Sequence, residues 1–177
     1  MSKLLIKLIY NIVSLGVDFM IRYAKKEELE RVNELRKQVF DIHAKGRPDI
    51  CRDEFSEEFQ DTIYGLWGSE DSDVIVAVIN NIICGFTSVE YIDKPISPYT
   101  HSRRYYHILE FGVDEKYRRQ KVATEMFEFI KKESIEKGFD KLELDVFTFN
   151  EGAVKFYESL GFSAYRIYME YGNTMKI

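Results

Sequence analysis

A short basic turn carries the residues best suited to bind an anion. It reads Arg118-Arg119-Gln120-Lys121 and lies between a predicted strand that ends at Val113 and a predicted helix that begins near Val122. The first amides of a helix have no intrahelical acceptor and lie at the positive end of the helix dipole, so they bind phosphate groups well. The turn therefore predicts a pyrophosphate site, although a short basic run is also typical of a solvated turn.

Two carboxylates on predicted neighbouring strands could move a proton. Glu110 lies on the strand before the basic turn, and Asp145 lies near the end of the next strand along the chain. Either could accept a proton through water if burial strengthened it as a base, and either could instead face solvent. Gly112 interrupts the first of these strands, which indicates a β-bulge or a close backbone approach, or only relief of crowding.

The elements that would position these residues alternate in an orderly way. Asn80-Asn81 predicts a hairpin turn between two apolar strands. Periodicity by itself gives a mixed α/β sheet. We predict strands over residues 20–24, 74–79, 82–91, 105–113, 142–146 and 165–171, and helices over residues 26–44, 53–67 and 122–137, with a last helix from Asn150 to Gly161.

Two stretches resemble the signatures of GNAT-type N-acetyltransferases. Residues 150–162 match the pattern Asn-x-x-Ala-x-x-Phe/Leu-Tyr-Glu-x-x-Gly-Phe, and residues 118–123 match Gln/Arg-x-x-Gly-x-Gly/Ala except that Lys121 replaces the first small residue. If the backbone there has a positive φ, this lysine costs on the order of 1 kcal/mol. The resemblance covers about residues 20–171. It implies an α/β fold with a mixed, mostly antiparallel, twisted sheet of six to seven strands, about four flanking helices and a V-shaped opening between the two central strands.

The resemblance also implies acetyl-CoA as the cofactor and assigns roles to residues. Tyr157 is the expected acid that protonates the departing thiolate, with Glu110 or Asp145 as the base; an isolated tyrosine would be read as a surface aromatic. Asn150 could equally be only a helix N-cap. The expected cofactor-binding residues are Phe111, Gly112, Val113, Arg118, Arg119, Gln120, Lys121, Val122, Ala123, Thr124, Asn150, Ala153 and Phe156.

The acceptor pocket of such folds is built from the first two helices and the loop before the fourth strand. On this chain the candidates are His43, Tyr64, Trp67 and Tyr106, which could also be packing aromatics. The expected activity is transfer of an acetyl group to a primary amine, of a small molecule or a peptide, by direct attack in a ternary complex. A non-catalytic acyl-CoA-binding regulatory module and a structural protein are the competing classes, and the fold does not determine the acceptor.

Composition narrows the remaining classes. The 177 residues are 45% apolar with a net charge of −5, which favours one ordinary domain over residues 20–177 and argues against nucleic-acid binding. Two cysteines and three histidines lack the spacing of a disulfide framework or a metal site, so we expect no metal and a cytoplasmic protein. A homodimer is compatible with the sequence.

Residues 1–19 read as an amphipathic helical extension. Its apolar residues form one helical stripe, but the stretch is too short to span a bilayer. Three interpretations stay open: a helix packed on the domain or a partner, a membrane-surface helix without stable insertion, or a start assigned upstream of the true one at Met20. The stripe consists of Leu4, Leu5, Leu8, Ile9, Ile12 and Val13.

Overall fold

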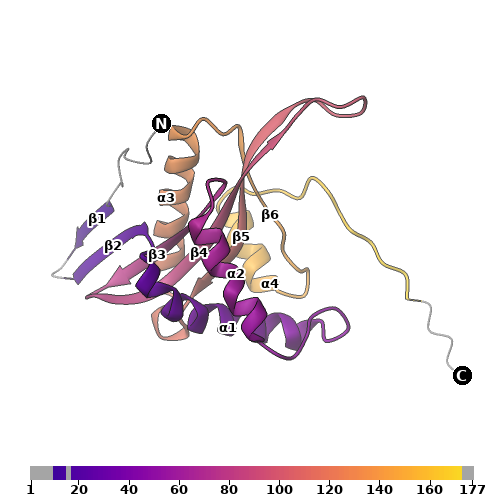
Figure 1. Cartoon of the computed structure of the whole chain (residues 1–177). Coiled ribbons are helices and arrows are strands. Elements are labelled where there is room, and N and C mark those ends of the chain that lie inside the picture. The colour runs from indigo at the N-terminus through magenta and orange to yellow at the C-terminus, as the bar shows by residue number, and fades with distance from the viewer. Residues whose placement is uncertain (1–9, 15–16, 173–177) are drawn as a thin grey trace, which may run out of the picture. The chain divides into compact units, whose positions relative to one another are not determined.

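The computed structural model describes residues 10–14 and 17–172, with side chains from Phe19 onward (Figure 1). The chain divides into two compact units, Met1–Asp145 and Val146–Ile177. No helix in these described ranges is long and apolar enough to cross a membrane.

The first unit is built on a six-stranded sheet whose strands lie in the order in which they occur along the chain. All neighbouring strands are antiparallel except β5 and β6, which are parallel. The predicted mixed, mostly antiparallel sheet is therefore confirmed, with six strands in the described residues. The strands are β1 (Tyr10–Ser14), β2 (Val17–Tyr23), β3 (Ser72–Ile79), β4 (Ile82–Lys94), β5 (Arg103–Val113) and β6 (Lys141–Leu144).

Helices cover both faces of this sheet. A 3-10 turn (η1, Lys26–Glu28) leads into α1 (Leu29–Gly46), and α2 (Glu57–Gly68) follows. These two helices pack on one face, where Val74, Val76 and Val78 of β3 join their apolar side chains in one core cluster. Side chains alternate along a strand, so Ile75 and Ala77 turn to the other face, and both are fully buried there. The other face is covered by α3 (Val122–Glu136), which connects the parallel strands β5 and β6 (Figure 1).

A β-bulge interrupts the pairing of β4 with β5. Glu110 is opposite Ser88, but the next residue of β4, Val89, is opposite Ile108, so Leu109 is the extra residue. Side chains on β5 change face at this point, because one inserted residue shifts the alternation by one. Gly112 itself is regularly paired with Phe86, so of the interpretations left open for this glycine the bulge does not apply. A Cβ built at Gly112 would lie 2.7 Å from Cε1 of Phe86, so glycine answers a close approach instead.

The parallel strands β5 and β6 stop pairing next to this bulge. The pairing of β5 with β6 ends at Ile108 and Leu144, whereas β5 continues beside β4 as far as Val113. The last residues of β5 therefore border the expected opening between the strands.

The N-terminal prediction is wrong where it can be compared. Residues 10–14 form a strand instead of a helix, paired with β2 from Tyr10 opposite Ile21 to Ser14 opposite Val17. β2 runs through Met20, so no change of structure coincides with the proposed boundary at that residue. Pairing with the edge of β2 overrides the helical spacing of Ile12 and Val13, whose β-branched side chains suit a strand. The rest of the predicted stripe lies outside the described residues.

The second unit contains one helix and an extended tail. α4 (Glu151–Ser159) is followed by Gly161, which has a φ of +94° and whose amide donates to the carbonyl of Glu158 at the end of the helix. The strand predicted over residues 165–171 is wrong: residues 162–172 form no regular element. A strand needs a partner for its amides, and the described part of this unit offers none. The large apolar side chains of the tail are exposed, as at Met169 and Tyr171.

Candidate active site

The loop that follows β5 is anchored to the body of the first unit by Asp114. Its carboxylate accepts from the amide of Lys116 at 3.1 Å and forms an ion pair with Arg31 of α1 at 2.5 Å. Burial acts to raise the pKa of Asp114, but the Lys116 amide and the Arg31 guanidinium outweigh it and the pKa is lowered. Asp114 therefore stays ionised and holds the 3-10 turn Glu115–Tyr117 (η2) at the entrance to the basic loop.

The basic loop enters α3 with two residues in the left-handed region. Arg119 has a φ of +63° and Lys121 a φ of +66°, while Arg118 has ordinary negative φ. Lys121 is the N-cap of α3, and its positive φ means that the steric cost expected for a lysine in place of glycine applies here. Left-handed residues next to right-handed ones turn successive amides toward one side, which is the backbone arrangement that binds anions.

The first turn of α3 has donors to offer. Ser56 caps α2 and Asn150 caps α4, but within the described chain no side chain caps α3. The first intrahelical bond there is from the amide of Glu125 to the carbonyl of Lys121. The amides of Val122, Ala123 and Thr124 therefore precede the intrahelical ladder at the positive end of the dipole. The four residues of the basic turn have exposed side chains, and none of its three cations forms an ion pair with another described residue.

The end of β5 directs its backbone toward the opening. The amide of Asp114 donates to the carbonyl of Cys84 in β4, which continues the antiparallel pattern one residue beyond the end of β5. Because every second residue of such a strand directs its polar groups to the same neighbour, Gly112 also faces β4. Phe111 and Val113 then face the edge that β6 does not reach. The Val113 carbonyl accepts from Nε of Arg118 at 3.2 Å, in agreement with this direction.

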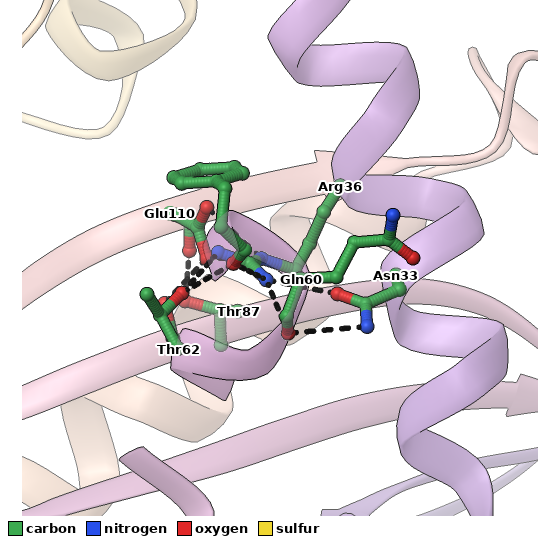
Figure 2. Close-up of polar contacts among 8 residues, drawn as sticks. Asn33, Arg36, Gln60, Thr62, Thr87 and Glu110 are labelled. Atoms are coloured by element: carbon green, nitrogen blue, oxygen red, sulfur yellow. Dashed lines mark hydrogen bonds and ion pairs between the residues drawn. The ribbon is translucent and has the colours of Figure 1, made fainter. Parts of the chain in front are cut away.

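Glu110 points to the face of the sheet that carries α1, where it meets a buried arginine. Nε of Arg36 donates to Oε2 of Glu110 at 2.9 Å and to Oε1 at 3.1 Å (Figure 2). The hydroxyl of Ser88 donates to Oε2 at 3.2 Å. The Arg36 side chain is 1% exposed and that of Glu110 is 21% exposed, so the carboxylate keeps one open side.

Sequence reasoning missed Arg36, although α1 carried a signal. Val32 and Phe40 lie one turn before and after it, so this charged residue interrupts the apolar stripe of the helix. A charge on such a stripe is almost never fully buried without a partner. Searching for that partner among strand carboxylates would have led toward Glu110.

Asp145 is not placed like Glu110. Its side chain is 86% exposed, one residue beyond β6, and its nearest recorded partner is Nε2 of His107 at 3.6 Å. No hydrogen bond or ion pair joins it to Glu110 among the residues that the structure describes. The solvent-facing interpretation fits Asp145, whereas Glu110 has the more constrained carboxylate.

The four candidate acceptor residues separate into two groups. Tyr106 is fully buried on the α3 face and donates to Glu133 at 2.5 Å, and the indole of Trp67 donates to the carbonyl of Ala24 at 2.9 Å. Both are packing residues, because their polar ends are satisfied inside the protein. Burial lowers the pKa of His43, opposed by the charge of Glu110, so His43 lies near that carboxylate. Tyr64 lines a depression of about 450 Å³ between α1 and α2.

In the second unit, Asn150 acts as an N-cap. Its side chain accepts from the amide of Ala153 at 3.2 Å, as the alternative interpretation of this residue required. Ala153 and Phe156 are half-buried. The ring of Tyr157 contacts that of Phe162 at a centroid distance of 5.7 Å, and burial raises the pKa of Tyr157 to about 12. Its hydroxyl is thus protonated at neutral pH, as a proton donor must be.

Comparison with known proteins agrees with this arrangement. A model of the acetyltransferase (GNAT) family matches residues 29–162. The chain therefore belongs to the GNAT acetyltransferase family, whose members use acetyl-CoA. A comparison with curated proteins gives no match.

Solved structures share the fold. A tetramutant of the BH1408 protein from Bacillus halodurans is 30% identical, with a TM-score of 0.82 over 86% of this chain and 98% of that chain. The aminoglycoside N-acetyltransferase AAC(6')-Iy in complex with CoA is 18% identical, with a TM-score of 0.71 over 92% and 99%. An aminoglycoside acetyltransferase from an uncultured soil metagenomic sample, in complex with sisomicin, is 18% identical, with a TM-score of 0.64 over 89% and 97%.

Proposed function

We propose that the protein is an acetyl-CoA-dependent N-acetyltransferase that acetylates a primary amine, of a small molecule or a peptide, by direct attack in a ternary complex. The observation that carries the proposal is the uncapped first turn of α3 behind a basic loop with two left-handed residues. This backbone fits a pyrophosphate. The amides of Val122, Ala123 and Thr124 would hold it, and Arg118, Arg119 and Lys121 would add charge. Gln120 completes the loop.

The remaining roles follow the two parts of the family signature. Acetyl-CoA supplies the thioester carbonyl that the amine attacks. The backbone of Phe111, Gly112 and Val113 borders the opening, and an amide directed there would stabilise the oxyanion. Asn150, Ala153 and Phe156 belong to the helix that the family uses for the cofactor's arm. Tyr157 would protonate the departing thiolate.

Glu110 is the proposed base. An ammonium group must lose a proton before it attacks, and Glu110 presents one open side of an oriented carboxylate. His43 lies close enough to sense its charge. Asp145 is the second candidate, and its exposure favours a role at the rim of the site.

The charge of α1 and α2, the two helices expected to bind the acceptor, supports a cationic acceptor. The depression between α1 and α2 is lined mostly by acidic and amide side chains, with Tyr64 and Phe55 as its aromatic members. A site rich in carboxylates raises the local concentration of protonated amines. Two of the structural neighbours are aminoglycoside acetyltransferases, so an aminoglycoside is a reasonable first acceptor to test. The acidic residues are Glu30, Glu34, Glu57 and Asp61.

The test is release of CoA thiol from acetyl-CoA with a panel of amines: sisomicin, spermidine, and peptides with a free N-terminus or a lysine side chain. Turnover with any of them supports the proposal. CoA binding without turnover across a widened amine panel would favour the non-catalytic regulatory module. Failure to bind CoA by calorimetry would overturn both.

The anion site has its own test. Arg118→Glu should raise the KM for acetyl-CoA while the melting temperature stays close to that of the wild type, because Arg118 is exposed. Lys131→Glu makes the same charge change further along α3 and serves as the control. Equal KM values for the two variants would remove the basic loop from the proposal.

A further inference from the structure

We propose that Arg36 is a positioning residue that fixes the carboxylate of Glu110 for proton transfer and ties it to α2. This inference rests on the proposed function, in which Glu110 is the base. Arg36 does not reach the open side of that carboxylate. It acts only through Glu110, on which it occupies both oxygens from the inner side.

The orientation of the guanidinium is fixed from several directions. Nη1 donates to Oδ1 of Asn33 at 2.8 Å and to the carbonyl of Phe59 at 3.1 Å, and Nη2 donates to the hydroxyl of Thr62 at 3.0 Å. The ring of Phe59 lies 4.5 Å from the guanidinium carbon. A planar group held by acceptors on two helices cannot rotate without breaking several bonds (Figure 2). Because Nε of this guanidinium donates to both oxygens of Glu110, the carboxylate is held in a fixed direction as well.

The β5 strand contributes the other half of the arrangement. If Leu109 were regularly paired and β5 had no bulge here, Glu110 would share the face of Tyr106, which meets Glu133 of α3. The bulge turns Glu110 toward Arg36 instead. Ser88, directly opposite on β4, then holds Oε2. The carboxylate is thus held by Arg36 of α1 and by Ser88 of β4, and its direction is set by these two helix and strand neighbours together with β5 itself.

Stability alone gives a weak reason for this ion pair. Removing a guanidinium from water is expensive, and an apolar side chain of similar size would often pack α1 against α2 at least as well. A fully buried arginine that meets a partly exposed carboxylate is better explained by what the carboxylate does. The same bonds join Glu110 to Phe59 and Thr62, so the placement of α2, an expected acceptor-binding helix, is linked to the base.

The experiment compares Arg36→Met, Arg36→Lys, Glu110→Gln and the double variant Arg36→Met/Glu110→Gln. It measures kcat, the KM for acetyl-CoA, and CoA affinity by calorimetry, with the panel amine that gives the highest turnover. Arg22→Met is the matched control, because it breaks a 2.7 Å ion pair with Glu28 elsewhere in the first unit.

Arg36→Met should lower kcat by roughly 10²-fold, as expected when a reacting group is misplaced, and leave CoA affinity unchanged. Arg36→Lys keeps the charge but not the planar donor geometry, and it should recover only part of kcat. The double variant should be no slower than Glu110→Gln, since both changes disable the same pair, Arg36 and Glu110, which acts as one unit.

The control should lower the melting temperature and leave kcat in place. A wild-type kcat in Arg36→Met would overturn the inference, as would a double variant that loses the product of the two single effects. If Arg36→Met does not fold, Arg36→Lys decides: an unchanged kcat overturns the inference. A wild type that binds no CoA overturns the proposed function itself, which is a separate result.

Discussion

Replacing Lys121 by glycine should stabilise the protein, against the usual expectation for glycine. Lys121 has a φ of +66° and a ψ of 4°, and its side chain is exposed and caps nothing. A residue with a Cβ pays roughly 1–2 kcal/mol in this left-handed region. Glycine removes that penalty but loses about 0.4–1 kcal/mol through the greater entropy of its unfolded chain. The net gain should be on the order of 1 kcal/mol, which is roughly 2–4 °C in a chain of this size.

The comparison with Lys121→Ala isolates the backbone. Both variants lose the same charge, but alanine keeps the penalty, so the glycine variant should melt higher by thermal denaturation. At Gln120, next to it and without a positive φ, the order should reverse, with alanine above glycine. Both Lys121 variants should raise the KM for acetyl-CoA. If Lys121→Gly and Lys121→Ala melt at the same temperature, the left-handed strain assigned to this loop is wrong.

Three further changes test other parts of the structure. Tyr157→Phe should lower kcat by about 10²-fold or more without changing CoA affinity, and normal turnover would leave Tyr157 only a packing role. Gly112→Ala should destabilise by about 1–3 kcal/mol, because its Cβ would press on Phe86, whereas Gly65→Ala, with nothing within 4 Å, should not. Burial raises the pKa of Glu133 in the folded protein. Protonated Glu133 therefore stabilises the fold fully below its unfolded-state pKa, and this contribution is lost as pH rises through the folded-state pKa. Glu133→Gln should therefore gain stability relative to the wild type as pH rises above the unfolded pKa of a glutamate, about 4.3; a constant difference would contradict this sign.

Much of the sheet could be predicted because its strands are read from local pattern. The run Val74–Ile79 is apolar throughout, as a strand covered on both faces must be, and Asn80-Asn81 supplies two positive φ values for the hairpin turn. Helix ends followed the same logic at Asn150 and Gly161. Elements with a local signal were therefore placed within a few residues.

Features that depend on pairing were harder to predict. The tail over residues 165–171 alternates like a strand, but a strand forms only beside a partner, and pattern does not supply one. Residues 10–14 show the opposite case, because a partner edge made a strand of a helical pattern. Tyr106 was assigned to a pocket because aromatic side chains serve both packing and binding, and only its burial distinguishes the two uses.

The bulge at Leu109 shows that the geometry of a site can depend on one residue that has no recognisable signal in the sequence. Leu109 has no turn chemistry, and Gly112, which does suggest an irregularity, is regularly paired. Yet the extra residue decides which face Glu110 occupies, since strand side chains alternate with a period of two. Arg36 can be buried only because that carboxylate arrives on its face, and Glu110 is oriented only because Arg36 is held by α2. The bulge and the buried arginine therefore depend on each other, and neither can be inferred from the sequence around it alone.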